Sequence, residues 1–367
     1  EGSAEIWSGI QIPTFTMPVM AETLGVARDA LTVNTMYTGG SFGRRSTPAS
    51  HFEREMAEVA AAGGPGAYKL QWTREDDMTG GYYRPLTVHH LRAGLDTDGN
   101  ITGWLNTVAN QSIVAGSIFE SALMADGLDA TAYEGSNHLA YDLPSHRLSW
   151  ARMESPVPVL WWRSVGHTHT AYAVETFLDE VLGAAGRDPV QGRLDMIRDD
   201  RPRDRAVLER VAEMADWSGP GTGDSRLGVA LVRSFGSYVA QIAEVEDRDG
   251  MPHVTRVWCA VDCGVAVTPD VVRAQMEGGI GFGLSSILYE EIELDEGGTV
   301  KQRNLDSYRL LTLPEMPQIE VSIVESDADP TGVGEPGTPP IAPAVGNAWR
   351  SLTGSLPYRL PFRANRA

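Results

Sequence analysis

Hydrophobic and polar positions follow two different periods along this chain, and together they predict both strands and helices. Apolar runs and alternation predict strands over residues 4–11, 31–37, 89–95, 101–108, 227–235, 238–247 and 253–261. Apolar residues three and four apart predict helices over 48–62, 174–182, 204–217 and 269–288, and another that Asp188-Pro189 opens as N-cap and first residue. The predicted fold class is therefore α+β, with mixed sheets and helices on their faces.

A glycine-rich segment, Gly219-Pro220-Gly221-Thr222-Gly223, is typical of a linker. It predicts two regions, 1–218 and 224–367, in a chain whose 367 residues suffice for two or three domains or one large one. The chain leads from Glu1-Gly2-Ser3 directly into its first predicted strand, with no initiator Met and no signal peptide. We therefore expect it to be a piece of something longer, made by a split gene or by cleavage.

Composition and charge exclude several classes of function. The formal net charge of -19 argues against a nucleic-acid partner, because phosphate binding needs clustered Lys and Arg, and the basic run 198–205 is interleaved with Asp. No apolar run approaches the roughly 20 residues that a membrane span needs, so the chain is not expected to be transmembrane. Two cysteines, Cys259 and Cys263, are too few to hold an iron-sulfur cluster or a structural zinc.

One carboxylate is flanked by residues that control the backbone, in Gly332-Val333-Gly334-Glu335-Pro336-Gly337-Thr338-Pro339-Pro340. Such flanking residues are a way of presenting a catalytic base. On spacing alone, the pattern favours an ordinary loop carboxylate at Glu335, before a helix that Thr338 caps and Pro339 begins.

The segment around Glu335 resembles the Gly-x-Gly-Glu-Pro motif of the molybdenum hydroxylases, the xanthine oxidase and aldehyde oxidase family. In that family the Glu takes a proton from a hydroxide on molybdenum. The following Thr-Pro-Pro-Ile-Ala-Pro-Ala-Val-Gly-Asn-Ala is similar to the isoquinoline 1-oxidoreductase large-subunit branch. The resemblance extends from Trp7 to Pro361 and implies the carboxy-terminal half of a large subunit, with molybdopterin-binding regions of that family's fold.

Further motifs occur in the family's order. The run Gly39-Gly40-Ser41-Phe42-Gly43-Arg44 resembles its Gly-Gly-x-Phe-Gly segment, whose backbone lies against the molybdenum centre. Gln11 resembles a Gln placed near the metal's oxo group, and Gln275-Met276-Glu277-Gly278 resembles a Gln-x-Glu-Gly motif on a helix that touches the pterin. The resemblance implies that Glu335 and Arg163 are catalytic. It implies that the cofactor-binding residues are Gln11, Gly39, Gly40, Ser41, Phe42, Gly43, Arg44, Gln275, Gly278 and Gly334.

The resemblance also implies cofactors and partners. The expected cofactor is molybdopterin cytosine dinucleotide with molybdenum, shared with a missing amino-terminal half, because no Gly-Gln-Gly or Ala-Ser-Ser segment is present here. The expected partners are that amino-terminal half, a small subunit with [2Fe-2S] clusters, an aldehyde or aromatic substrate, and a possible cytochrome c acceptor. The expected location is the periplasm, otherwise the cytoplasm.

Other interpretations remain open at this point. Gly39-Gly40-Ser41-Phe42-Gly43 also satisfies the Gly-x-Ser-x-Gly pattern of serine hydrolases, with Ser41 as nucleophile. Trp161 and Trp162 could line a pocket for an aromatic substrate or lie in the core. Four glycines inside the helix predicted over 269–288 need a reason, such as close packing of a backbone or of a cofactor. His167 and His169 lack a third ligand at a recognisable spacing, which argues against a metal site.

Overall fold

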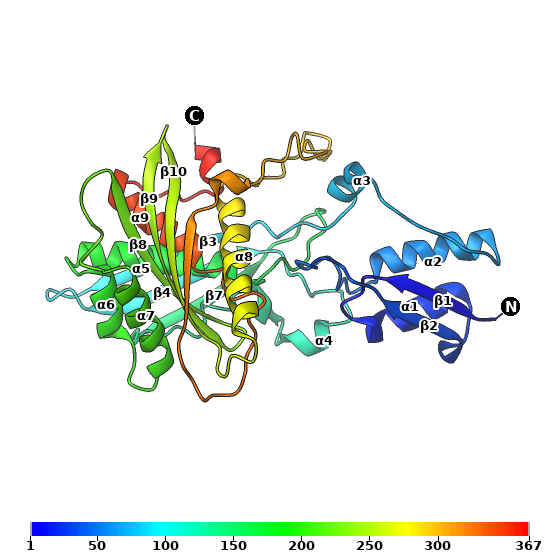
Figure 1. Cartoon of the computed structure of the whole chain (residues 1–367), viewed down its shortest axis with the longest axis horizontal. Helices are drawn as coiled ribbons and strands as arrows, with labels where there is room; N and C mark the ends of the chain where they lie inside the picture. The colour runs from blue at the N-terminus through cyan, green and yellow to red at the C-terminus, as the bar shows by residue number, and fades with distance from the viewer. Residues whose placement is uncertain (1, 366–367) are drawn as a thin grey trace. The chain divides into compact units, whose positions relative to one another are not determined.

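The chain folds into two compact units in a computed structural model that describes residues 2–365 (Figure 1). The first unit comprises the residues up to Leu86, Asn110–Ala132 and Arg152–Arg163. The second comprises Thr87–Ala109, Tyr133–Ala151 and the residues from Ser164 onward. The backbone therefore passes from one unit to the other several times, and Arg163 and Ser164, neighbours in sequence, belong to different units.

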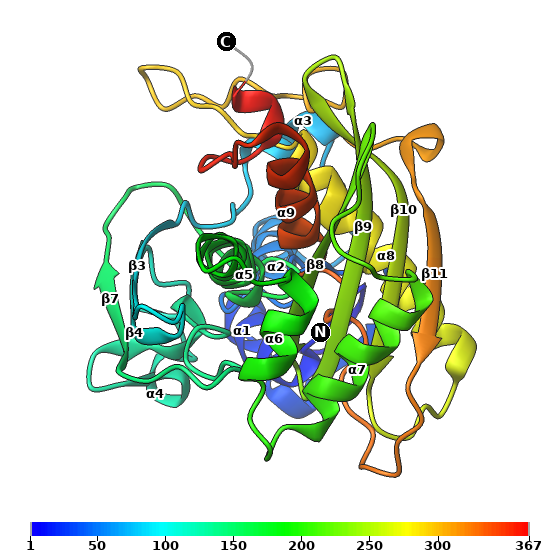
Figure 2. The same cartoon turned by 90° about the vertical axis from the view of Figure 1, so that its left-hand side faces the viewer.

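A four-stranded sheet forms the centre of the second unit, in the order β11-β10-β9-β8 (Figure 2). Its strands are β8 (Ser225–Ser234), β9 (Ser237–Arg248), β10 (Met251–Asp262) and β11 (Gln318–Ile323). The first three form an antiparallel meander, whereas β11 runs parallel to β10. Three of the four strands coincide with predicted ones, and the short, half-buried β11 was not predicted.

Helices cover both faces of this sheet, which explains why its strands are hydrophobic almost throughout. On one face, alternate strand residues such as Val239, Val257 and Cys259 pack with α8 (Pro269–Leu288) and α9 (Ile341–Thr353). On the other face, Val229, Ile242 and their neighbours pack with α5 (His167–Ala184), α6 (Pro189–Met196) and α7 (Pro202–Met214).

A second sheet in this unit has three strands, β3 (Val88–Leu95), β4 (Ile101–Asn110) and β7 (His146–Arg152), in the order β3-β4-β7. The first two form the antiparallel hairpin predicted around residues 96–100. Trp104 of β4 is fully buried and packs on Phe177 of α5, with ring centroids 5.0 Å apart. Helix α5 thus contacts both sheets.

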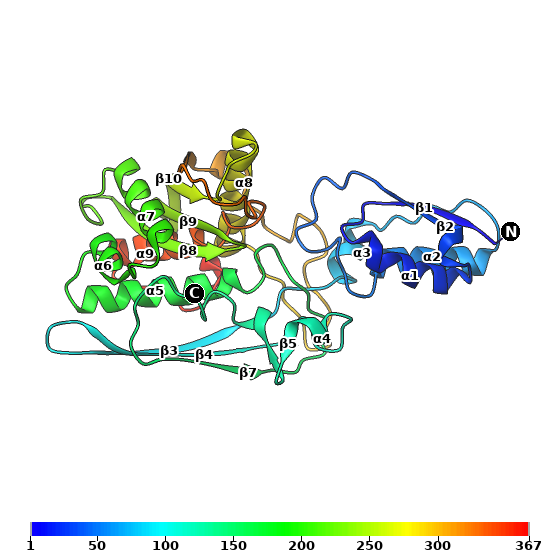
Figure 3. The same cartoon turned by 90° about the horizontal axis from the view of Figure 1, so that it is seen from below.

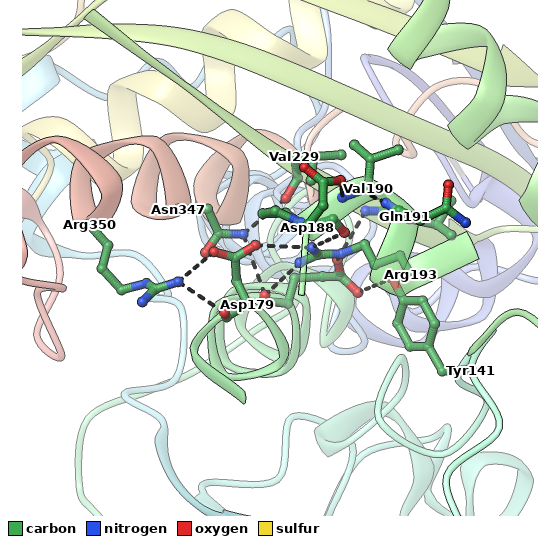
Figure 4. A network of polar contacts seen from close by, with 12 residues as sticks. Tyr141, Asp179, Asp188, Val190, Gln191, Arg193, Val229, Asn347 and Arg350 are labelled. Carbon is green, nitrogen blue, oxygen red and sulfur yellow. Dashed lines mark hydrogen bonds and ion pairs between the residues drawn. The ribbon is translucent and has the colours of Figure 1, made fainter. Parts of the chain in front are cut away.

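A buried ion network fixes α5 to α6 and α9 (Figure 4). Arg193, which has no exposed surface, binds Glu175 Oε2 and Asp179 Oδ1, both at 3.0 Å. The other carboxylate oxygen of Asp179 accepts a bond of 2.7 Å from Arg350 of α9, and Glu175 Oε1 accepts one from the Tyr141 hydroxyl. Burial opposes the charge of Arg193, but the neighbouring carboxylates outweigh it and hold the pKa of Arg193 above its usual value.

The first unit contains a two-stranded parallel sheet, β1 (Ala4–Ser8) and β2 (Leu31–Thr35), with α1 (Pro13–Leu24) and α2 (His51–Gly63) packed on it (Figure 3). Ile6 and Leu31 of the strands meet Met20 and Ala57 of the helices in a small core. The other α-helices and strands of this unit are α3 (Arg74–Thr79), α4 (Glu120–Leu123), β5 (Met124–Ala125) and β6 (Leu128–Asp129), and short 3-10 helices lie at Arg28–Ala30 and Ala130–Ala132. None of the described helices is long and apolar enough to cross a membrane.

Several predicted boundaries need correction. The first two strands end at Ser8 and Thr35, before residues 11 and 37, because both chain segments turn into loops there. The helix predicted from residue 48 begins at His51, and the one predicted from 204 begins at Pro202, where proline occupies the first helical position. Helix α8 matches its prediction in full, and Asp188 caps α6 as predicted, by accepting bonds from the amides of Val190 and Gln191.

Candidate active site

Glu335 lies at the start of a β-turn. The amide of Thr338 donates to the carbonyl of Glu335 at 3.0 Å, with Pro336 and Gly337 in the middle of the turn. Residues 336–340 are buried, whereas Glu335 is half-buried. The prediction that Thr338 caps a helix is therefore wrong, because Thr338 closes this turn and α9 begins three residues later, at Ile341.

Ser164, a residue far away in sequence, holds Glu335 at two points. Its backbone N–H donates to Glu335 Oε1 at 2.9 Å, and its hydroxyl donates to the Glu335 carbonyl oxygen at 2.7 Å. Ser164 is fully buried. Its φ of 76° and the φ of 50° at Val165 place two successive residues other than glycine in the left-handed region.

The three glycines of the Glu335 segment contribute the absence of a side chain rather than unusual dihedral angles, because none of them has a positive φ. A Cβ on Gly332 would lie 3.0 Å from Cβ of Phe235, and one on Gly337 would lie 3.0 Å from Cα of Met276. A Cβ on Gly334 would meet no atom within 4 Å. The backbone distortion in this region thus lies at Ser164 and Val165.

Helix α8 supports the turn through its glycines. A Cβ on Gly279 would lie 3.0 Å from the carbonyl carbon of Gly337, and one on Gly283 would lie 3.0 Å from the carbonyl oxygen of Thr338. From the sheet, the fully buried Gln241 donates to the Gly337 carbonyl at 2.8 Å. Close packing of a backbone therefore explains Gly279, and at Gly283 the Ile341 side chain, 2.5 Å from a Cβ there, adds to the contact with the Thr338 carbonyl. Close packing does not explain Gly278, which is exposed and has open space where a Cβ would be. Gln275, one turn earlier, is half-buried.

In the first unit, the loops that follow β1 and β2 lie together. The two parallel strands end at the same edge, with Ser8 paired to Thr35. The amide of Gln11 then donates to the carbonyl of Arg45 at 2.9 Å. Gln11 is thereby placed beside the end of the glycine loop 39–44.

The glycine loop has an irregular backbone that needs its glycines. Gly39, Gly40 and Gly43 have φ of 71°, 125° and 115°, and Phe42 between them has a φ of 53°. A Cβ on Gly40 would lie 2.7 Å from the Phe42 ring, and one on Gly43 would overlap the carbonyl of Trp161. Next to Gly39, by contrast, a Cβ would meet no atom within 4 Å.

Aromatic side chains and Arg163 lie around this loop. Trp161 donates from Nε1 to the Gly43 carbonyl at 3.1 Å and contacts Phe119, with ring centroids 5.6 Å apart. The Arg163 guanidinium lies 5.9 Å from the centroid of the Phe42 ring, and that phenylalanine is half-exposed. Trp161 and Trp162 are only partly buried, so neither belongs to the core.

The guanidinium carbon of Arg44 lies over two aromatic rings, 4.6 Å from the centroid of the Phe52 ring and 5.5 Å from that of the Tyr82 ring. Both of its terminal nitrogens are buried without a hydrogen-bond acceptor among residues 2–365. Burial lowers the pKa of Arg44 from its usual value. Two buried cationic donors without acceptors fit an anionic group.

The loop around Ser41 does not have the geometry of a hydrolase. In a nucleophile elbow the serine sits between a strand and the helix that it begins. Here β2 ends at Thr35, and α2 begins at His51. The Ser41 hydroxyl instead accepts a bond from the Arg45 amide at 3.1 Å, which closes the loop on itself. The serine hydrolase alternative therefore has no support.

The histidines form polar pairs. His89 Nε2 lies 2.9 Å from His169 Nδ1, and His167 Nε2 lies 3.7 Å from a carboxylate oxygen of Glu134. Within the described part of the chain, no group of three or more His, Cys, Asp or Glu could hold a metal ion.

Two of these histidines predict a pH dependence of stability. Burial lowers the pKa of His89 and of His167 from 6.5 to about 4. In the unfolded chain these two histidines are therefore protonated below about pH 6.5, whereas in the folded chain they are protonated only below about pH 4. The free energy of unfolding should fall between these pH values, by roughly 2–3 kcal/mol for each histidine, and level off below them.

Urea unfolding at pH 7 and pH 4.5 measures this fall. In a double variant, His89→Asn with His167→Gln, the fall should be smaller, whereas His90→Gln, at an exposed position, should leave it unchanged. An equal fall in all three proteins would contradict the assignment.

Comparison with known proteins identifies the family. A family model described as a molybdopterin cofactor-binding domain matches residues 1–196, and a second model of the same description matches 215–317. The chain belongs to this family and is a molybdenum hydroxylase large-subunit-like protein, which confirms the resemblance.

Several curated relatives match nearly the whole chain. The subunit beta of isoquinoline 1-oxidoreductase from Brevundimonas diminuta is 35% identical over 99% of this chain and 46% of its own length. A membrane-bound aldehyde dehydrogenase (pyrroloquinoline-quinone) from Gluconacetobacter polyoxogenes is 29% identical over 99% of this chain and 50% of its own length. The chain thus spans about half the length of these two relatives.

A solved structure has the same fold. Quinoline 2-oxidoreductase from Pseudomonas putida 86 superimposes with a TM-score of 0.84 at 13% identity, covering 98% of this chain and 71% of the other. The α+β fold class is confirmed.

Sequence reasoning missed Ser164, Gln241 and the four-charge network of Glu175, Asp179, Arg193 and Arg350. Only the network has a recognisable sequence signal, because Glu175 and Asp179 occur four residues apart within the apolar stripe of α5. Two acidic residues on a buried helix face indicate buried cations.

Proposed function

We propose that this chain is part of the large catalytic subunit of a molybdenum hydroxylase, which oxidises an aldehyde or an N-heteroaromatic substrate with water as oxygen donor. The observation that carries the proposal is the fixation of Glu335, whose carboxylate and carbonyl both bind one buried serine. An ordinary loop carboxylate would not need a turn held by two helix glycines and a buried glutamine.

The residues present fit a molybdopterin cofactor. Gly39, Gly278 and Gly334 all have open space where a Cβ would be, so a ligand could approach the main chain there. The orphaned donors of Arg44 fit an anionic group such as a phosphate. We propose that Gln11, the loop 39–44, Gln275, Gly278 and Gly334 hold the cofactor, within the regions 1–218 and 224–367.

The bound cofactor supplies the two-electron redox chemistry and the oxygen transfer. The chain's own contribution is binding, orientation and proton transfer. Glu335 takes the proton released by the oxygen donor, and Arg163 orients the substrate or stabilises developing negative charge with its fixed pair of donors. The half-exposed ring of Phe42 and the partly buried Trp161 supply apolar surface for a planar substrate.

We further propose the partners and the form of the cofactor. The relative named subunit beta is about twice as long as this chain, which supports a further half of the large subunit. We propose that this half is the amino-terminal one. Electrons leave through [2Fe-2S] clusters on a small subunit, and a cytochrome c is a possible acceptor. The cofactor is proposed to be the cytosine dinucleotide form, and the assembly is proposed to lie in the periplasm.

The exposed Gly278 gives a sharp test. Gly278→Leu should stabilise α8 by about 0.5–1 kcal/mol in the metal-free assembly, because an interior helix glycine is replaced by a good helix former. The same side chain would occupy the space that we assign to the cofactor, so the molybdenum content of the purified assembly should fall several-fold. Metal analysis and thermal unfolding of the same samples measure both effects.

Arg273→Leu, at an exposed position elsewhere on α8, is the matched control and should leave the molybdenum content unchanged. Full molybdenum occupancy in Gly278→Leu would remove this residue from the cofactor site. An assembly of wild-type sequence that contains no molybdenum would overturn the proposed function itself.

A further inference from the structure

Ser164 and Glu335 form a contact that nothing in the family motif requires. We propose that Ser164 is a positioning residue: its hydroxyl anchors the main chain of Glu335 and its amide holds Oε1, so that Oε2 is the oxygen that takes the proton. This inference rests on the proposed function of Glu335 as the base. The amide of Ser164 binds Oε1 at 2.9 Å, and among the described residues no hydrogen bond reaches Oε2.

The local backbone is shaped for this contact. Ser164 and Val165 adopt left-handed conformations in succession, which residues other than glycine avoid. The distorted pair directs the Ser164 amide to Glu335 and the Gly166 amide to Glu134 Oε1, each at 2.9 Å. Conformations of this kind persist where the surrounding structure enforces them, and they are concentrated at functional sites.

Ser164 and Glu335 each lie shortly before the first residue of a helix. Ser164 precedes α5 by three residues, and Glu335 precedes α9 by six. These two helices are joined by the bond of 2.7 Å between Asp179 and Arg350 and by Asn347 of α9, which donates to the carbonyl of Glu175 in α5 at 3.4 Å. The separation between Ser164 and Glu335 is therefore fixed by the packing of α5 on α9. A carboxylate held in this way reaches its reactive orientation without a conformational search.

The chain offers a matched control in Ser237. It is fully buried like Ser164, and its hydroxyl binds the carbonyl of Gly332 at 2.7 Å, in the same segment but three residues before Glu335. Ser164→Ala and Ser237→Ala each remove one buried serine hydroxyl that binds a carbonyl of this segment. If Ser164 only stabilises the segment, the two variants should behave alike.

In the molybdenum-loaded assembly, Ser164→Ala should lower kcat by about ten- to hundredfold with KM within about twofold, since a displaced catalytic group mainly affects the reaction step. Ser237→Ala should lower Tm by a comparable amount and leave kcat unchanged. Ser164→Gly keeps the amide, suits the left-handed conformation and should raise Tm relative to Ser164→Ala while kcat stays low. Wild-type kcat in Ser164→Gly, or equal kcat losses at Ser164 and Ser237, would overturn the proposal.

A double variant distinguishes the proposed role of Ser164 from the proposed role of Glu335 as the base. If Ser164 acts through Glu335, Ser164→Ala should have no further effect on kcat in a Glu335→Gln background. A Glu335→Gln enzyme of normal activity would refute the base itself. An inactive Glu335→Gln enzyme, in which Ser164→Ala lowers the residual kcat as much as in the wild type, would refute only the role of Ser164.

Hydrogen exchange provides a readout that does not depend on activity. Glu335→Ala removes the acceptor of the Ser164 amide, so exchange in peptides spanning residues 160–168 should accelerate several-fold. Glu335→Gln retains an oxygen acceptor and should leave this exchange close to wild type. Equal protection in Glu335→Ala and the wild type would show that the contact does not form in solution.

Discussion

Replacing Glu335 by glutamine is expected to leave the assembly folded and loaded with molybdenum while kcat falls by about 10²–10⁴-fold. Glutamine keeps an oxygen that can accept the Ser164 amide, and the main-chain bonds of the turn are untouched. Only the ability to take a proton is lost. Steady-state kinetics together with metal analysis of the same preparation measure the effect.

The control for this variant is Glu325→Gln, which removes an exposed carboxylate between β11 and the Glu335 segment. It should keep kcat within about twofold, as expected for a solvent-exposed residue away from the chemistry. If Glu335→Gln retained a tenth of the wild-type rate at full molybdenum occupancy, another group would have to be the base.

Arg193→Met is expected to give the largest loss of stability, about 3–5 kcal/mol in the free energy of unfolding. Arg193 is fully buried between Glu175 and Asp179, and its removal leaves two carboxylates in the core with only the bonds from Tyr141, Arg350 and the Leu231 amide. Methionine has a similar volume, so the loss reflects the missing charge rather than a cavity. Urea unfolding of the purified assembly measures it.

The exposed ion pair of Arg54 and Glu58, 3.1 Å apart on α2, serves for comparison. Arg54→Met should cost less than about 0.5 kcal/mol, because water screens a surface pair. The conclusion that burial makes Arg193 important fails if the two variants lose the same amount of stability.

Local sequence predicted the elements whose signals are local. The helix 269–288 was placed correctly because Pro269 marks its first residue and apolar positions continue to Leu288. Asp188-Pro189 likewise fixed the start of α6. The central strands β8, β9 and β10 were recognised because a sheet covered on both faces leaves long apolar runs in sequence.

The parts that were missed depend on contacts between distant segments. Thr338 and Pro339 have the local pattern of a helix start, but packing of residues 337–341 on Gly279 and Gly283 draws them into the turn after Glu335. Ser164 and Glu335 are 171 residues apart, and the residue types at Ser164 and Val165 do not predict a left-handed backbone. The motif therefore named Glu335 as the candidate base, whereas Ser164, the residue that holds it, is identified only by the fold.

The glycine contacts between α8 and the Glu335 turn also determine how this site can vary. Where main chain rests directly on main chain, no rotamer lies between them to absorb a change, so a larger residue at Gly279 has no partner position that could shrink to make room for it. Gly337, on the opposite side of the contact, is already the smallest residue available. Sequence drift is thus blocked at both positions at once, while exposed positions of α8 outside the proposed cofactor site, such as Arg273, stay free to change. The location of Glu335 can therefore be inherited unaltered while the surrounding surface diverges.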